Sequence, residues 1–369
     1  MNKSTNNKKN RLSAFLGVIA FSGLVSIAVS CNKNNNSSGS SNMGTTRTLP
    51  QAAGTTTGSK AAMHQSLTSV ATIAMLSNAS DGRSLRAMFY ENEQILNVID
   101  DAAIASLKDA FANNKPVKIT YDPWAALLIT VAQPSAQDLV ANSRQINTAS
   151  GASTKIDLAH MSPDLINDPQ AMGVVNTTDP GLTPVIPDMQ TAQRMFDYIE
   201  HQCCQLPGPY TVDHCITFQY CPDGCYARAH KMCYILNTTY KYATQKVFSF
   251  ANSGTDELCV KAEKWNGCCI NWWYHVSPLV TILTPQGPKA YVFDPAMFDQ
   301  PVTLYTWLHA QENPSCVPSG KVPHVSMIAI RPTASYQPAN TLGTMFSTDP
   351  AYSGTNSTLV SYMHLISCP

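Results

Sequence analysis

The sequence of residues 222–232 is PDGCYARAHKM, and it predicts a cysteine at the first turn of a helix. Asp223 and Gly224 are turn-forming residues, and from Cys225 to Leu236 the apolar side chains recur on one helical face. A helix N-terminus favours a thiolate, and its free N–H groups can stabilise an oxyanion. The stretch is therefore typical of a cysteine nucleophile. It provides the Cys225 N–H as one oxyanion donor and leaves the second donor unidentified.

A cysteine nucleophile needs a base that takes its proton and a third group that orients this base. His275 lies in the stretch WWYHV, a predicted strand whose bulky neighbours would exclude water. Asp294 follows another predicted strand, and strand ends commonly present functional side chains. The order Cys225, His275, Asp294 is that of papain-like and transglutaminase-like enzymes. With 12 cysteines and 9 histidines in the chain, this spacing alone is a weak signal.

Residues 182–307 resemble the catalytic domain of the bacterial protein-glutaminase family. The matching stretches are VIPD (185–188), CITF (215–218), DGCYARAHKM (223–232), CC (268–269), YHV (274–276) and DPAMF (294–298). The family's nucleophile falls on Cys225, its base on His275 and its orienting acid on Asp294. Cys221 and Cys233 depart from the family pattern, and the resemblance fades after about Trp307.

This resemblance implies hydrolysis of protein-bound glutamine side chains to glutamate, with release of ammonia through a thioester on Cys225. It implies protein or peptide substrates and no cofactor. A transglutaminase or a thiol protease would use the same triad and remains an alternative. A non-enzymatic alternative is a disulfide-rich surface binding protein in which Cys225 is cross-linked.

The predicted fold class is α+β, with the cysteine-bearing helix packed on an antiparallel sheet and a small α+β pro-domain in front. We expect a catalytic domain over residues 181–369. Its helix begins at Pro187-Asp188, and its strands cover 216–220, 247–250, 270–283, 289–293 and 325–330.

Residues 63–180 contain no cysteine and form the predicted pro-domain. Apolar residues from Ile95 to Phe111 recur at helical spacing, strands are expected over 117–121 and 125–132, and a short helix over 136–146. Residues 161–187 read as a linker because they are rich in Pro, Asp, Asn and Thr. The resemblance implies that the pro-domain inhibits the enzyme until a protease cuts this linker.

The first 30 residues predict an export signal, with basic residues before an apolar run that ends at Cys31. Cys31 fits the lipidated residue of a lipoprotein, and an ordinary signal peptide is the alternative. Residues 31–62 read as a flexible tether, since they are almost devoid of apolar side chains. We therefore expect an exported protein, anchored as a cell-surface or outer-membrane lipoprotein or released after processing.

The other charged residues and the other cysteines are predicted to have structural roles. Lys and Arg number 24, as do Asp and Glu, so the neutral chain gives no sign of nucleic-acid binding. Setting aside Cys31 and Cys225 leaves ten cysteines, enough for five disulfides, with Cys215 expected to pair with Cys203 or Cys204. His230 reads as structural, and Arg228 as a solvated or structural cation. Zinc binding by Cys221, Cys225, His201 and the Cys203–Cys204 pair is a weaker alternative than disulfides.

Overall fold

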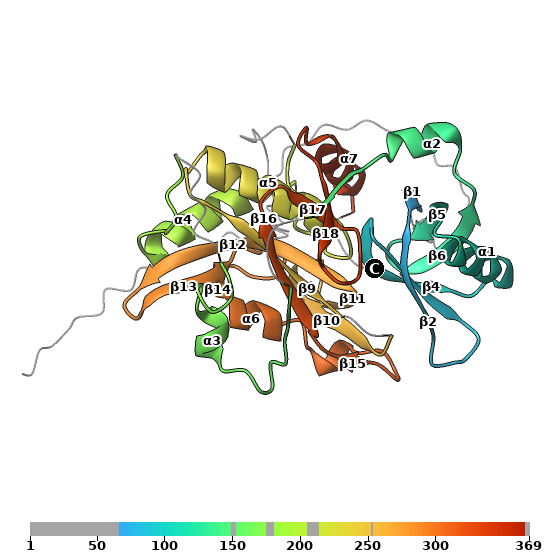
Figure 1. Ribbon diagram of the computed structural model, residues 1–369, viewed down its shortest axis with the longest axis horizontal. Coiled ribbons are helices and arrows are strands. Elements are labelled where there is room, and N and C mark those ends of the chain that lie inside the picture. Colours follow the sequence, from blue (N-terminus) through green and yellow to red (C-terminus); the bar gives the residue numbers. More distant parts are fainter. Residues whose placement is uncertain (1–65, 149–152, 175–180, 205–213, 252–253, 366–369) are drawn as a thin grey trace, which may run out of the picture.

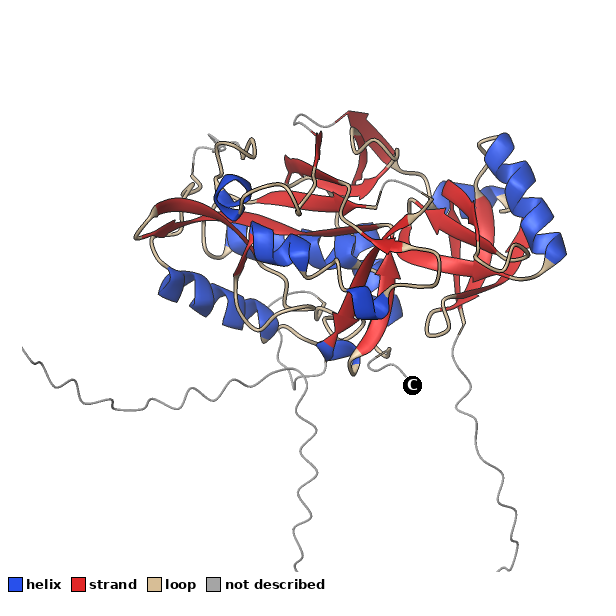
Figure 2. Ribbon diagram, turned by 90° about the horizontal axis from the view of Figure 1, so that it is seen from below, coloured by secondary structure: helices blue, strands red, loops and turns tan. Residues whose placement is uncertain are grey.

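The computed structural model describes residues 66–148, 153–174, 181–204, 214–251 and 254–365. The fold is α+β, as the sequence predicts, and both ends of the molecule combine helices with strands (Figures 1 and 2). The predicted export signal and tether, residues 1–62, lie outside the described residues. Among the described helices, none has the length and apolar character needed to cross a membrane.

An N-terminal unit lies at one end of the molecule, coloured blue to teal in Figure 1. Its elements are β1 (Leu67–Ala71), β2 (Ile73–Asn78), β3 (Leu85–Phe89), β4 (Asn92–Val98), α1 (Asp101–Ala112), β5 (Val117–Asp122), β6 (Leu127–Ala132) and α2 (Ala136–Ala141). These elements enclose an apolar core of their own, built from residues between Ala71 and Leu128. The unit is thus a packed body and not an extended arm.

The prediction of a helix over residues 95–111 is wrong at its beginning, because residues 92–98 form strand β4. Leu96 and Val98 pack into the core of the N-terminal unit, whereas Ile95 packs into the larger core of the rest of the chain. The few apolar residues of this short buried strand, Ile95, Leu96 and Val98, do not show by their spacing whether they belong to a strand or to the start of a helix. Helix α1 begins after Asp100, whose side chain accepts a hydrogen bond from the Ala103 N–H.

The C-terminal unit is built on a six-stranded antiparallel sheet with the order β14-β13-β12-β9-β16-β8. Its strands are β8 (Ser153–Lys155), β9 (Gln245–Phe250), β12 (Tyr274–Thr284), β13 (Gly287–Val292), β14 (Val302–Thr303) and β16 (Met327–Pro332). Helix α5 (Cys225–Thr238) packs on β12 at the centre of this sheet. The predicted arrangement of a cysteine-bearing helix on an antiparallel sheet is therefore confirmed.

Further elements surround this core. They are α3 (Pro163–Asn167), α4 (Met189–Glu200), α6 (Leu304–His309), α7 (Ser353–Tyr362), β7 (Gln145–Thr148), β10 (Asp256–Ala262), β11 (Cys268–Trp272), β15 (Val322–Pro323), β17 (Ser335–Pro338) and β18 (Met345–Thr348), with short 3₁₀ turns at Glu263–Trp265 and Pro314–Cys316. Asp188 caps α4 as predicted. Two strand predictions are wrong. Residues 216–220 form only an isolated bridge at Ile216, and the strand expected over 270–283 is divided at Trp273 into β11 and β12.

The two units share one sheet, because β4 of the N-terminal unit pairs antiparallel with β11 through Gln94 and Trp272. The chain between the units is also structured in part. Strand β7 pairs with β18, β8 pairs with β16, and α3 buries Ile166 within the stretch that reads as a linker. The pro-domain boundary at residue 180 stays a prediction, and these three elements lie on its N-terminal side.

Disulfides join Cys204 to Cys215 and Cys269 to Cys316, and Cys268 is also disulfide-bonded. The first bridge confirms one of the predicted pairings. The ten cysteines do not form the five bridges that their number permits, because Cys221, Cys233 and Cys259 are buried thiols. Such thiols behave as small apolar side chains, which explains why a cysteine count overestimates the cross-links.

Candidate active site

Cys225 occupies the first position of α5, as the sequence predicts. The residue before it, Gly224, has a φ of 89°, a left-handed conformation that favours glycine. A Cβ atom on Gly224 would also lie only 2.9 Å from the ring of Tyr362. Glycine is therefore required at this turn, which aims the N–H groups of the helix start towards the surroundings of Cys225.

His275 lies in β12 and Asp294 follows β13, so neighbouring strands bring the two together. The Nε2 atom of His275 is 2.8 Å from Oδ2 of Asp294. The indole of Trp307 donates to the same oxygen at 2.8 Å, and the Trp272 ring stacks on the imidazole with centroids 4.3 Å apart. These contacts fix the imidazole so that its other nitrogen, Nδ1, points away from Asp294.

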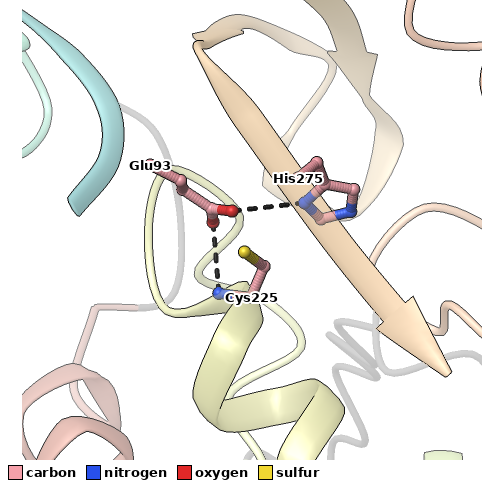
Figure 3. A group of neighbouring side chains, drawn as sticks. All are labelled: Glu93, Cys225 and His275. Carbon is pink, nitrogen blue, oxygen red and sulfur yellow. Dashed lines mark hydrogen bonds and ion pairs between the residues drawn. The ribbon is translucent and has the colours of Figure 1, made fainter. Parts of the chain in front are cut away.

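A glutamate that the sequence analysis missed contacts both the cysteine and the histidine (Figure 3). Glu93, from β4 of the N-terminal unit, accepts a hydrogen bond from the Cys225 N–H through Oε1 at 3.2 Å. Its Oε2 lies 3.2 Å from Nδ1 of His275. Sγ of Cys225, a ring nitrogen of His275 and a carboxylate oxygen of Glu93 lie within 4.8 Å of one another, and all three residues are buried. A side chain of the N-terminal unit thus contacts both predicted reactive residues.

Arg228, one turn along α5, is not the solvated cation that one reading of the sequence allowed, since it is only 2% exposed. Its Nη1 donates to the backbone oxygens of Tyr220 and Asp223 at 2.7 and 2.8 Å. Its Nη2 lies 3.4 Å from Oε1 of Glu93. A buried cation therefore lies beside the same carboxylate oxygen that accepts the Cys225 N–H.

His230 has the structural role that its sequence position predicts. Its Nε2 is 3.1 Å from the backbone oxygen of Asp349, and Lys246 lies 2.7 Å from its Nδ1. Burial, together with the charge of Lys246, lowers the pKa of His230 to about 2, so the ring is neutral. It belongs to the packing between α5 and the C-terminal elements.

The electrostatics of the site oppose a thiolate in this arrangement. Burial raises the pKa of the Cys225 thiol well above its usual value, and the charge of Glu93 raises it further. Burial opposes a charged His275, but the carboxylates of Asp294 and Glu93 outweigh this effect and raise the pKa of the imidazole. The nucleophile is thus held in its protonated form while Glu93 is present.

A zinc ion accepts carboxylate, thiolate and imidazole ligands. Among the described residues, Glu93, Cys225 and His275 form a group with these side chains whose ligand atoms lie within 4.8 Å of one another. The set considered from the sequence, in which Cys221 and His201 join Cys225, is not brought together there. The chemistry that the geometry favours is that of a cysteine beside an oriented imidazole.

Comparisons with known proteins find one family and several solved structures that resemble this chain. Residues 192–311 match a family described as glutaminase. Two solved structures of pro-protein-glutaminase, one of its A47Q2 mutant, are each 25% identical to this chain with a TM-score of 0.56. The matches cover 81% of this chain and 93% and 94% of those chains. The structure of protein-glutaminase from Chryseobacterium proteolyticum is 32% identical over 51% of this chain and 93% of its own, with a TM-score of 0.42. No curated protein matches the chain.

In this chain an N-terminal unit lies on a cysteine-bearing helix and an antiparallel sheet, and the two solved structures that resemble it over 81% of its length are those of a pro-form enzyme. The chain belongs to the protein-glutaminase family, and it is an enzyme. The family match over residues 192–311 covers much of the stretch in which the sequence itself shows the resemblance.

Proposed function

We propose that this enzyme hydrolyses the side-chain amide of glutamine within proteins and peptides, giving glutamate and ammonia. The observation that carries the proposal is the position of the Glu93 carboxylate, which contacts both the Cys225 N–H and the His275 imidazole. A glutamate side chain is the product of this reaction. The site therefore accommodates a side chain of the length and shape that the reaction requires.

In the proposed reaction, His275 takes the proton of the Cys225 thiol, and the sulfur attacks the amide carbon of the substrate. The oxyanion forms where Oε1 of Glu93 lies, so the Cys225 N–H and Arg228 are its donors. His275 then gives its proton to the amide nitrogen, which leaves as ammonia, and a thioester remains on Cys225. The imidazole next takes a proton from water, whose oxygen attacks the thioester and releases glutamate and the free thiol.

Asp294 positions the imidazole in this scheme. Its hydrogen bond to Nε2 leaves Nδ1 to face the reacting atoms, and its negative charge stabilises the imidazolium. The Trp307 indole holds the carboxylate in place. The sequence assignment of Cys225, His275 and Asp294 is thus supported by mutual geometry, with Arg228 added as an oxyanion donor.

We further propose that the N-terminal unit is an inhibitory propeptide. Glu93 occupies the space of a substrate side chain and raises the pKa of the nucleophile. Cleavage by a protease within residues 161–187 would allow the unit to dissociate. Dissociation must also separate the pairings β4–β11, β7–β18 and β8–β16 if the cut lies near residue 180.

The test uses casein and the chain cut at an engineered protease site between Val174 and Gly181. We expect ammonia release and deamidated casein monomers by mass spectrometry. Covalent casein oligomers would instead assign a transglutaminase, and backbone fragments a protease. Titration of the folded protein that finds Cys225 in a disulfide would favour the non-enzymatic binding protein.

Export and anchoring are separate proposals that rest on residues 1–31. We propose that Cys31 carries a lipid and that processing releases the enzyme. Labelling cells with a fatty acid should mark the wild-type chain and not Cys31→Ser. Equal labelling of both would remove the lipoprotein assignment.

A further inference from the structure

A buried carboxylate that the proposed reaction does not use lies next to the nucleophile. Asp223 is two residues before Cys225 and is only 1% exposed. Its Oδ1 accepts the Glu93 N–H at 3.1 Å, and its Oδ2 accepts the hydroxyl of Tyr362. Burial and the charge of Glu93 raise the pKa of Asp223 to about 7, and the hydrogen bond from Tyr362 opposes this rise. Because a buried carboxylate is costly without donors, Tyr362 stabilises its charged form.

The ring of Tyr362 also packs on the turn that precedes α5. Its centroid lies 4.5 Å from that of Tyr220, and a Cβ atom on Gly224 would be 2.9 Å from the ring. Arg228 holds the main chain of the same turn, because its Nη1 donates to the carbonyls of Tyr220 and Asp223. The turn is therefore held through its main chain by a residue of α5 and through the Asp223 side chain by a residue of α7.

Helix α7 lies beyond residues 192–311, which match the glutaminase family, and it packs on α5 (Figure 1). At its first turn, the Asp349 carboxylate accepts the N–H and the hydroxyl of Thr355, each at 2.7 Å. The Asp349 carbonyl lies 3.1 Å from Nε2 of His230, in the middle of α5. At its last turn, α7 carries Tyr362. The position of the Tyr362 ring is thus set by contacts within the C-terminal unit.

We propose that Tyr362 is a positioning residue for the nucleophile, because its hydroxyl holds the Asp223 carboxylate and thereby the turn that sets the Cys225 N–H. Dissociation of the N-terminal unit removes two neighbours of this pair, the Glu93 N–H and the hydroxyl of Tyr121, which lies 3.4 Å from that of Tyr362. The bond between Tyr362 and Asp223 stays within the C-terminal unit and keeps the turn in place during the reaction. This inference rests on the proposed deamidation.

The experiment measures ammonia release from a blocked peptide with one glutamine, using the chain cut between Val174 and Gly181. Tyr362→Phe keeps the ring against Gly224 and removes the hydroxyl. We expect kcat to fall about tenfold, because a hydrogen bond to a buried charged group is lost. KM should change less than about twofold, because the nucleophile and its N–H act in the transition state and not in substrate binding.

Tyr336→Phe is the matched control. The Tyr336 ring packs on α5 with its centroid 5.1 Å from that of Tyr226, and its hydroxyl is not bonded to Asp223. This variant should keep kcat within about twofold of the wild type, since it removes a buried hydroxyl that does not hold the turn. Thermal unfolding of both variants confirms that they are folded at the assay temperature.

A double-variant cycle tests whether Tyr362 acts through Asp223. Asp223→Asn alone should lower kcat, and Tyr362→Phe should add less than about threefold in that background, since the two residues share one interaction. Near wild-type kcat in Tyr362→Phe, an equal loss in Tyr336→Phe, a rise in KM in place of the fall in kcat, or losses that multiply would overturn the inference and leave deamidation intact. Absence of ammonia release by the wild-type cut chain, from the peptide and from casein, would overturn the proposed function and this inference together.

Discussion

The two units of this molecule differ in how they are stabilised and in what they contribute to the site. The N-terminal unit has no cysteine and encloses its own apolar core. The C-terminal unit carries two described bridges, Cys204–Cys215 and Cys269–Cys316. Cys225, His275, Asp294 and Arg228 all belong to the C-terminal unit, and Glu93 of the other unit contacts three of them. This difference is the reason why we propose that the C-terminal unit carries the chemistry and that the N-terminal unit blocks it.

The largest expected effect tests whether the C-terminal unit alone carries the chemistry. In the cut chain, Cys225→Ala and His275→Ala should lower ammonia release from casein on the order of 10⁴-fold or more, because both act in every step. Asp294→Asn should retain some activity, since it orients the base and does not react. Thermal unfolding serves as the control, and a Cys225→Ala enzyme with near wild-type turnover would refute the assignment.

The second prediction tests the blocking role of the N-terminal unit. Cutting between Val174 and Gly181 should raise specific activity on the order of 100-fold or more, because a tethered inhibitor acts at a high effective concentration until it dissociates. Activity should increase with time and dilution as β8 separates from β16. Equal specific activity before and after the cut would make the N-terminal unit an ordinary second domain.

A third, smaller effect isolates the contribution of Glu93. In the uncut chain, Glu93→Ala should increase alkylation of Cys225 about tenfold, because lost contacts make transient undocking more frequent. Glu91→Ala is the matched control. Glu91 is also buried in the N-terminal unit, but it pairs with Arg144 at 2.6 Å and not with the site. Peptide mapping identifies the alkylated cysteine, and equal rates in the two variants would contradict the blocking role of Glu93.

The smallest effect concerns stability. Each native bridge should contribute roughly 2–5 kcal/mol, so reduction should lower the unfolding temperature of the C-terminal unit and leave that of the cysteine-free unit unchanged. Hydrogen exchange with and without reductant distinguishes the units. Loss of protection in β1–β6 before α5 would show that the N-terminal unit depends on its partner for its fold.

The sequence predicted the parts of the site that depend on local chemistry. Cys225 lies at a helix start because Asp223-Gly224 forms a turn, and a short strand precedes Asp294. Contacts between segments that are distant in the sequence are not indicated by any local sequence pattern. Glu93 and Cys225 are 132 residues apart, and a polar run within a buried strand was the only sign of Glu93. Arg228 was undervalued for the same reason, because one of its partners is the Glu93 carboxylate of the other unit.

The break at Trp273 shows the same limit on a smaller scale. Most side chains from Ile270 to Leu283 are apolar or aromatic, so the sequence favours one long strand. In the structure, β11 pairs with β10 and β4, whereas β12 pairs with β9 and β13. The change of partners at Trp273 frees its N–H for the Glu93 carbonyl. Partner choice is a tertiary property, and hydrophobic periodicity does not encode it.

The central claim is that residue 93 occupies the place of the target glutamine, and the uncut Glu93→Gln variant tests it most directly. Mass spectrometry of the peptide containing residue 93 should show the introduced glutamine converted to glutamate, or held as a hydroxylamine-sensitive thioester to Cys225 after loss of ammonia. The double variant Glu93→Gln/Cys225→Ala should keep the glutamine intact. An unchanged glutamine in the presence of Cys225, in a chain that deamidates casein once cut, would contradict the claim.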